Sequence, residues 1–191
     1  SFKEKKRWLF YDRNELLAHE LCHVARVSLH SEIYEEIFAY QSATTAFRRF
    51  FGGIFRSPKD SFMFIAVSCL LFLSQITKAF VFPALYSWPF WLLILLFFTY
   101  LSVQHYKVMK KLRKAEKLLQ NYLGKEMAMP VLFRCTDREI EALSQLNNQK
   151  ELQTWLENRK SSSLRWKVIA ERFFCQTSQT SQTSQTSQTS Q

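Results

Sequence analysis

The chain has 191 residues, of which 47% are hydrophobic and 16% aromatic, and its formal net charge is +10 at pH 7. On a soluble chain such a charge would suggest nucleic acid, but no nucleic-acid motif is recognisable and the aromatic residues lie in apolar runs, so we expect no nucleic-acid partner. The four cysteines have no paired or C-x-x-C spacing, which implies no disulfide framework and fits a reducing cytosol.

The first long element is a helix predicted over Arg13 to Leu29, with Asp12 as its N-cap and Glu15 as the capping-box partner. It contains His19-Glu20-Leu21-Cys22-His23, an H-E-x-x-H motif. Histidines four residues apart project from one helix face, so both imidazoles can bind one metal ion. The spacing suits zinc, and Glu20 between them is expected to act as a general base for water rather than as a ligand.

A second helix is predicted to begin at Ser31, with Glu32 and Glu35 in its first turn. Glu36, Ala39 and Ala43 share one face of this helix. The small alanines would let it approach the motif helix closely. Glu36 is therefore predicted to complete a zinc site of two histidines and one glutamate, with the fourth position open to water.

Several residues near the motif have two interpretations. Glu35 is the alternative third ligand, although one residue of helix rotates a side chain by about 100°. His30 stands one residue too late for the metzincin pattern, and Arg26 replaces its glycine, so we interpret His30 as a loop residue. Arg26 is expected to pair with Glu35 or another carboxylate, or else to stabilise a transition-state oxyanion. Tyr40 either packs or assists catalysis, and Cys22 is expected to pack, facing away from the metal.

The two motifs together resemble the gluzincin metallopeptidases. The nearest analogues are the integral-membrane CAAX-prenyl-protease and heat-shock membrane-protease group, in which H-E-x-x-H on one helix is followed by E-x-x-A-D on another. The match covers about residues 8–45 and falls on His19, Glu20 and His23, then on Glu36-Ile37-Phe38-Ala39, with Tyr40 where that family has an acid. The resemblance implies a zinc metalloendopeptidase that acts on peptide or membrane-protein substrates.

Zincins place a β-strand edge beside the active-site helix, where it holds the substrate backbone. The candidate strand here is the short run Arg7–Tyr11. The chain begins at Ser1 rather than methionine, which is typical of a fragment. Two arrangements therefore stay open: the sheet lies upstream of this fragment, or the fold is a reduced version made of helices only.

Two uncharged apolar runs follow, Ser61–Thr77 and Ala79–Val103, each long enough to cross a hydrocarbon core of about 30 Å. The prolines near their junction favour a two-span hairpin over a single long span. Basic residues bracket the runs, and only Lys78 is expected in the connection. The positive-inside rule then predicts an integral membrane protein with both termini in the cytoplasm, and the flanking cations should attract anionic lipid.

Beyond the hairpin we expect a basic amphipathic helix from Gln104 to Leu123 that stops at Gly124. Met129-Pro130 predicts a break, followed by a short strand or docking segment at residues 131–133. Three more helices are predicted around Trp155 and Trp166: from a capping box at 136–139 to about Leu146, from Lys150 to Asn158, and from Ser163 to Phe174. The Gln-Thr-Ser repeat at 176–191 has no apolar residue and is predicted to be disordered.

The predicted protein is mainly α and has four parts: a zincin-like metal-site region (1–60), a transmembrane hairpin (61–103), a basic helix with a helical cytosolic region (104–175) and the repeat tail (176–191). We expect a membrane-anchored zinc metallopeptidase that hydrolyses peptide bonds at the cytosolic membrane face. His19, His23 and Glu36 would hold Zn²⁺, and Glu20 would be the base. The alternative is a non-catalytic membrane protein that keeps the helix pair for structure or partner binding.

Overall fold

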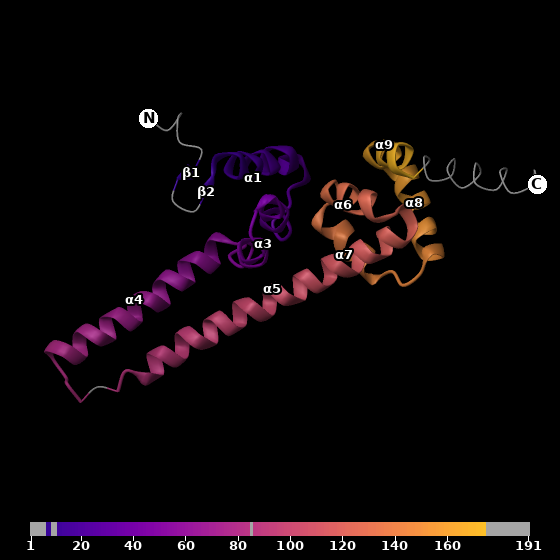
Figure 1. The fold of residues 1–191 in the computed structure, drawn as a ribbon. Helices are drawn as coiled ribbons and strands as arrows, with labels where there is room; N and C mark the ends of the chain where they lie inside the picture. Colours follow the sequence, from indigo (N-terminus) through magenta and orange to yellow (C-terminus); the bar gives the residue numbers. More distant parts are fainter. Residues whose placement is uncertain (1–6, 9–10, 85, 175–191) are drawn as a thin grey trace, which may run out of the picture. The chain divides into compact units, whose positions relative to one another are not determined.

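The computed structural model describes residues 7–8, 11–84 and 86–174, which are mainly helical (Figure 1). The elements are β1 (Arg7–Trp8), β2 (Tyr11–Asp12), α1 (Arg13–Arg26), η1 (Val27–Leu29), α2 (Glu35–Ala39), η2 (Tyr40–Ser42), α3 (Ala46–Phe51), α4 (Pro58–Phe80), α5 (Trp88–Leu123), α6 (Lys125–Phe133), α7 (Asp137–Gln145), α8 (Gln149–Ser162) and α9 (Leu164–Phe173). The chain divides into two compact units between Met109 and Lys110. The predicted repeat tail lies outside the described residues.

The N-terminal segment forms a minimal antiparallel ladder in which Arg7 pairs with Asp12 and Trp8 with Tyr11. The strand predicted over this run is thus two strands of two residues each. Such a ladder is far shorter than the mean strand of about 5–6 residues. The described residues around the motif helix are therefore mainly helical.

At the start of α1 the predicted N-cap is confirmed, but the predicted capping-box partner is wrong. Asp12 is the N-cap, and its carboxylate accepts a hydrogen bond from the Asn14 backbone N–H at 2.8 Å. Glu15, however, does not close a capping box, because its buried carboxylate pairs with Arg48 at 2.8 Å and accepts from the Thr44 backbone N–H at 3.2 Å. Glu15 therefore ties α1 to the segment that leads into α3.

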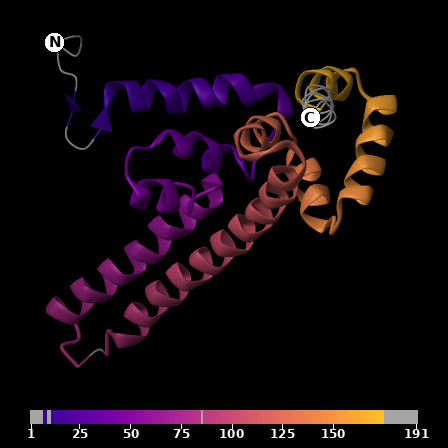
Figure 2. The same cartoon turned by 45° about the vertical axis from the view of Figure 1, so that its right-hand side comes forward.

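The second helix begins four residues later than predicted, at Glu35 instead of Ser31. His30 has a left-handed φ of +48° and lies in the loop, as predicted, and the chain then runs through bends before α2. The side chain of Ser31 accepts a hydrogen bond from buried Arg26 at 3.1 Å, and Tyr34 is also buried. These contacts hold the loop in a non-helical path, which returns α2 against α1 (Figures 1 and 2).

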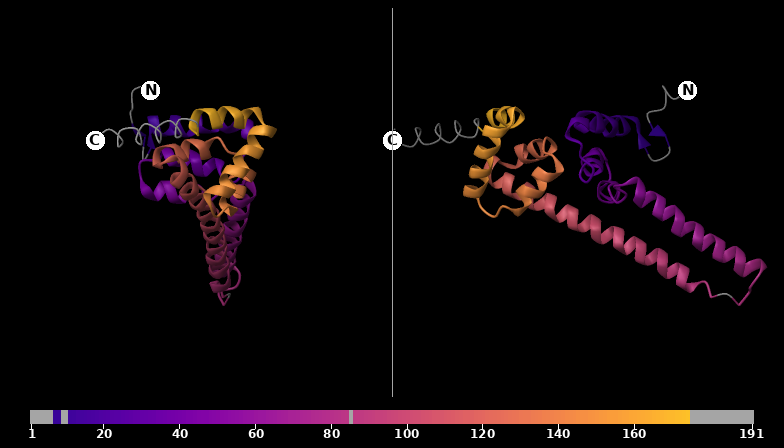
Figure 3. Two further views of the ribbon diagram at one scale, coloured as in Figure 1. Left: turned by 90° about the vertical axis from the view of Figure 1, so that its right-hand side faces the viewer. Right: turned by 180° about the vertical axis from the view of Figure 1, so that it is seen from behind.

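The first unit also contains a long antiparallel helical hairpin formed by α4 and the beginning of α5 (Figure 3). Both helices are long and apolar enough to cross a membrane. Most of their apolar side chains are exposed. Phe64 of α4 nevertheless packs edge-on against Phe98 of α5, with ring centroids 5.4 Å apart.

The turn of this hairpin differs from the prediction. α4 continues to Phe80 and α5 begins at Trp88, so Lys78 lies in the last turn of α4 and not in the connection. The second apolar helix likewise does not start at Ala79. A lysine in the last helical turn compensates the partial negative charge there, which lets α4 run past the cation.

Helix α5 contacts the turn that follows α3. His105 is buried, and its Nδ1 lies 3.2 Å from the carbonyl oxygen of Gly53. Its ring also packs edge-on against Phe50 at 5.1 Å. Gly53 lies against Ile37 of α2, where an added Cβ would be 3.0 Å from the isoleucine side chain. The hairpin and the motif helices are thus parts of one packed unit.

The second unit is built around the end of α5 and α6 to α9. Gly124, with φ of +89°, separates α5 from α6 as predicted. The break predicted at Met129-Pro130 and the strand after it are wrong, because α6 runs through Pro130. Ala128, Val131 and Leu132 are fully buried, so tertiary packing outweighs the hydrogen bond that proline cannot donate.

A buried carboxylate organises the helices of the second unit. Glu139 closes the predicted capping box with Thr136, and its Oε1 accepts from the indole N–H of Trp166 at 2.6 Å and from Arg165 at 2.5 Å. Burial raises the pKa of Glu139, but these hydrogen bonds outweigh burial and the net pKa is lowered. Trp166 is fully buried, which confirms it as a core residue, and it packs edge-on against Trp155, which is half-buried. Helix α8 extends four residues beyond its predicted end.

Candidate metal centre

The motif helix and the first turn of α2 bring three metal-binding side chains together. The Nε2 atoms of His19 and His23 are 3.3 Å apart, and carboxylate oxygens of Glu36 lie 3.8 Å from His19 Nε2 and 3.6 Å from His23 Nε2. All three ligand atoms lie within 4.8 Å of one another. In tetrahedral zinc sites with bonds of about 2.0–2.1 Å, neighbouring ligand atoms are about 3.3 Å apart. Two imidazoles and one carboxylate at this spacing fit a zinc ion.

The local packing explains why these side chains meet. The two histidines lie one turn apart on α1, and α2 contacts this helix. Ile37 and Ala39 of α2 are buried, as is Ala43 beyond its end. Burial of the two alanines is consistent with the close approach of the helices expected from the sequence. Cys22 is buried beside the same contact, and burial raises the pKa of its thiol. Its packing role agrees with the prediction.

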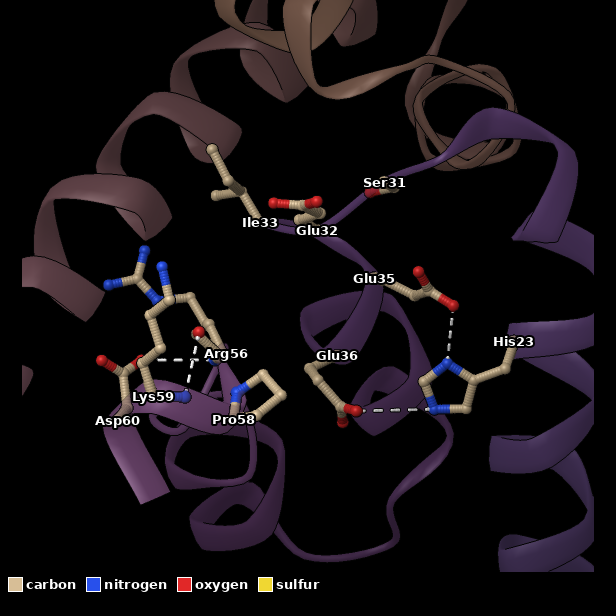
Figure 4. Close-up of a pocket in the computed structure, with 11 residues that line it drawn as sticks. His23, Ser31, Glu32, Ile33, Glu35, Glu36, Arg56, Pro58, Lys59 and Asp60 are labelled. Atoms are coloured by element: carbon tan, nitrogen blue, oxygen red, sulfur yellow. Dashed lines mark hydrogen bonds and ion pairs between the residues drawn. The ribbon is translucent and has the colours of Figure 1, made fainter. Parts of the chain in front are cut away.

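Glu35 and Glu36 are adjacent but occupy different places around His23. Glu36 faces Nε2 of the imidazole, whereas Glu35 Oε1 lies 2.8 Å from Nδ1 on the other side of the ring (Figure 4). A metal-binding histidine commonly donates its second ring N–H to a carboxylate, which sets its tautomer and orientation. The structure therefore brings Glu36 into the ligand group and places Glu35 behind His23.

Tyr40 supports the other histidine by packing. Its ring meets His19 edge-on, with centroids 4.7 Å apart. Gly52 also lies against this ring, since an added Cβ would be 2.2 Å from a Tyr40 ring carbon. Sequence patterns single out Tyr40 but not Gly52. The available signal for Gly52 is the Gly-Gly pair directly after an aromatic helix, since glycine marks close approach.

Three other candidate residues lie outside the ligand group. Arg26 is fully buried, where it donates to Ser31 and lies 4.4 Å above the ring of Phe38. These contacts place Arg26 in the packing of the loop between α1 and α2. Glu20 is exposed on α1 and forms no hydrogen bond or ion pair with any described residue. His30 is exposed in its loop.

An open cleft of about 710 Å³ lies beside the ligand group (Figure 4). It is lined by His23, Glu35 and Glu36, by the loop residues Ser31, Glu32 and Ile33, and by Arg56, Ser57, Pro58, Lys59 and Asp60. Residues 56–60 comprise the two residues before α4 and its first turn. From sequence, Arg56 and Lys59 are interpreted only as membrane-flanking cations, because no motif marks them as neighbours of the predicted metal ligands.

Comparisons with protein-family models, curated proteins and solved structures find no match to this chain. Function is therefore inferred from the ligand group and the cleft beside it.

Proposed function

We propose that the protein is a membrane-anchored zinc metalloendopeptidase that hydrolyses peptide bonds at the cytosolic face of the membrane. The observation that carries the proposal is the convergence of His19, His23 and Glu36, whose ligand atoms all lie within 4.8 Å of one another. Structural zinc sites are usually closed by four protein ligands. Three protein ligands next to an open cleft are the arrangement typical of catalytic zinc.

Zinc, Glu20 and Glu35 have different roles in the proposed hydrolysis. Zinc at this position supplies Lewis-acid chemistry, which polarises a peptide carbonyl and makes water a better nucleophile. Glu20 follows His19 on α1, and its carboxylate has no partner among the described residues, so it can accept the proton of the attacking water and return it to the leaving amine. Glu35 keeps His23 oriented through its 2.8 Å contact.

The membrane anchor in this proposal is the hairpin of α4 and α5. Its support is the length and hydropathy of the two helices and their exposed apolar surface. Exposed Phe47 and Phe51, one turn apart on α3, add an apolar face suited to the lipid interface next to α4. Cations flank both helices, which supports cytoplasmic termini and contact with anionic lipid.

One observation favours the second candidate function, a non-catalytic membrane protein that uses the helix pair to bind a partner. Leu17, Leu21 and Val24 form an exposed apolar stripe on α1, at helical spacings of four and three residues. A peptidase does not need this stripe. It is the surface on which a partner would pack if the metal centre were only structural.

The test separates metal binding from hydrolysis in the purified full-length protein. Metal-free protein reloaded with zinc should hold one zinc per chain by mass spectrometry and should cleave a casein-derived peptide mixture. Glu20→Gln should abolish cleavage and retain zinc, because Glu20 is a base, whereas His19→Ala and His23→Ala should lose the metal. Equal loss of zinc in all three variants would contradict the assigned roles. Stoichiometric zinc without cleavage by the unmodified protein would favour the second candidate.

A further inference from the structure

The wall of the cleft opposite His23, Glu35 and Glu36 carries two cationic side chains. Arg56 precedes α4 and Lys59 lies in its first turn, and both line the same cleft as His23 and Glu36. Figure 4 shows the two cationic side chains on one side of the cleft and the histidine with its two glutamates on the other. A substrate bound at the metal would therefore extend past a pair of positive charges.

No residue in the described part of the chain neutralises Arg56. Its guanidinium makes no hydrogen bond or ion pair there, and its Nε is buried without an acceptor. Asp60 is the nearest acid along the chain, but its carboxylate accepts from the Ser57 backbone N–H at 3.3 Å in the capping box of α4. A carboxylate bound in the cleft would supply the acceptor that the Arg56 guanidinium lacks among the described residues.

We propose that Arg56, with Lys59 beside it, binds a carboxylate of the peptide substrate, so that the enzyme selects peptides with an acidic group near the bond that is cleaved. This inference rests on the proposed peptidase function. Guanidinium groups bind carboxylates with two parallel hydrogen bonds, which fixes the position of the bound group as well as its charge. The cleft, at about 710 Å³, is within the usual size range of ligand pockets and can hold a short peptide segment.

A lipid phosphate is the competing partner for Arg56, because Arg56 lies just before a helix that can cross a membrane. The cleft favours the peptide: Arg56 shares it with the metal ligands and has a buried Nε, whereas Arg49 is exposed on α3 and does not line the cleft. Arg49 is therefore the matched control, since it carries the same charge and also precedes α4.

The first experiment profiles cleavage of a random peptide library by zinc-loaded full-length protein in detergent, read by mass spectrometry. The library contains free and amidated C-termini, so the profile distinguishes a side-chain carboxylate from a terminal one. We expect an acidic group enriched at one fixed distance from the cleaved bond. Arg56→Gln should abolish this enrichment and raise KM for acidic peptides roughly tenfold or more, with kcat little changed, and Arg49→Gln should preserve it. Cleavage without acidic preference would overturn the inference and leave the peptidase proposal intact.

The second experiment does not depend on catalysis. Fluorescent peptides of alanine, leucine and phenylalanine, carrying either one glutamate or one glutamine and ending in an amide or a free carboxylate, are titrated into zinc-loaded Glu20→Gln protein. Peptides with a carboxylate should bind roughly tenfold or more tightly than the neutral one, and Arg56→Gln should remove the difference. Equal binding of all peptides would refute the carboxylate site. If Arg56→Gln instead lowers only binding to anionic vesicles, the partner is lipid phosphate and the inference is wrong.

Discussion

Replacing Glu35 by glutamine tests the different roles of the two adjacent glutamates. The Glu35 carboxylate lies 2.8 Å from Nδ1 of His23, while Nε2 of the same ring faces Glu36. Glutamine keeps the size of the side chain and an acceptor oxygen but removes the negative charge that makes the imidazole a stronger ligand. Loss of such a supporting carboxylate costs about 10- to 100-fold in metal affinity, or about 1.4–2.8 kcal/mol. Glu36→Gln should cost more, because it alters a ligand directly.

The assay is competition for zinc between the detergent-solubilised protein and a chromophoric chelator. Glu32→Gln is the control, since Glu32 is exposed and lines the same cleft but does not belong to the ligand group. We expect zinc affinity to fall in the order Glu32→Gln, Glu35→Gln, Glu36→Gln, with Glu32→Gln close to the unmodified protein. The reasoning fails if Glu35→Gln binds zinc as tightly as the unmodified protein, or if it loses more affinity than Glu36→Gln does.

Three further outcomes are expected. Gly52→Ala should lower zinc affinity and melting temperature, because its Cβ would lie 2.2 Å from the Tyr40 ring and overpacking costs about 1–3 kcal/mol. Gly53→Ala, whose Cβ would have its nearest contact at 3.0 Å, should lower both quantities less. Equal effects of the two substitutions would contradict this reasoning. Glu139→Ala should destabilise the second unit by about 1–3 kcal/mol in urea unfolding. The pKa of Glu139 is lowered in the folded protein, so the stabilisation that its ionised carboxylate gives is complete above the ordinary pKa of 4.5 and is lost as pH falls below it. If Glu139→Ala destabilised the protein equally in acid, this account of Glu139 would be wrong. Cysteine reporters near Gln149 should be shielded in sealed right-side-out cells and reporters in the turn between α4 and α5 accessible; outside labelling near Gln149 would contradict the hairpin topology.

The parts of this protein that could be predicted from sequence depend on short-range geometry. A spacing of four residues places His19 and His23 on one helix face whatever surrounds the helix. The caps at Asp12 and Thr136 are equally local, because each side chain bonds a backbone N–H two or three residues ahead. The two apolar helices follow from composition and length, although their ends do not.

The parts that could not be predicted depend on contacts between distant residues. Glu15 satisfies the local pattern of a capping box, but an ion pair with Arg48 outweighs it. The late start of α2 follows from a hydrogen bond between Arg26 and Ser31 that no periodicity encodes. Arg56 resembles any membrane-flanking cation until the cleft places it opposite the ligands. In each case a tertiary partner decides the role of a residue whose local signal suggested another.

The contacts that hold α1, α2 and the segment before α3 together join residues close in the sequence. The contact from His23 to Glu35 spans 12 residues and that from Glu15 to Thr44 spans 29, so the ligand group is assembled from a short stretch of chain. Contacts at such small separations form early, because little loop-closure entropy opposes them. Every residue of this stretch also leaves the ribosome before the first apolar helix is complete. The ligand group can therefore acquire its geometry during synthesis, before α4 and α5 are complete.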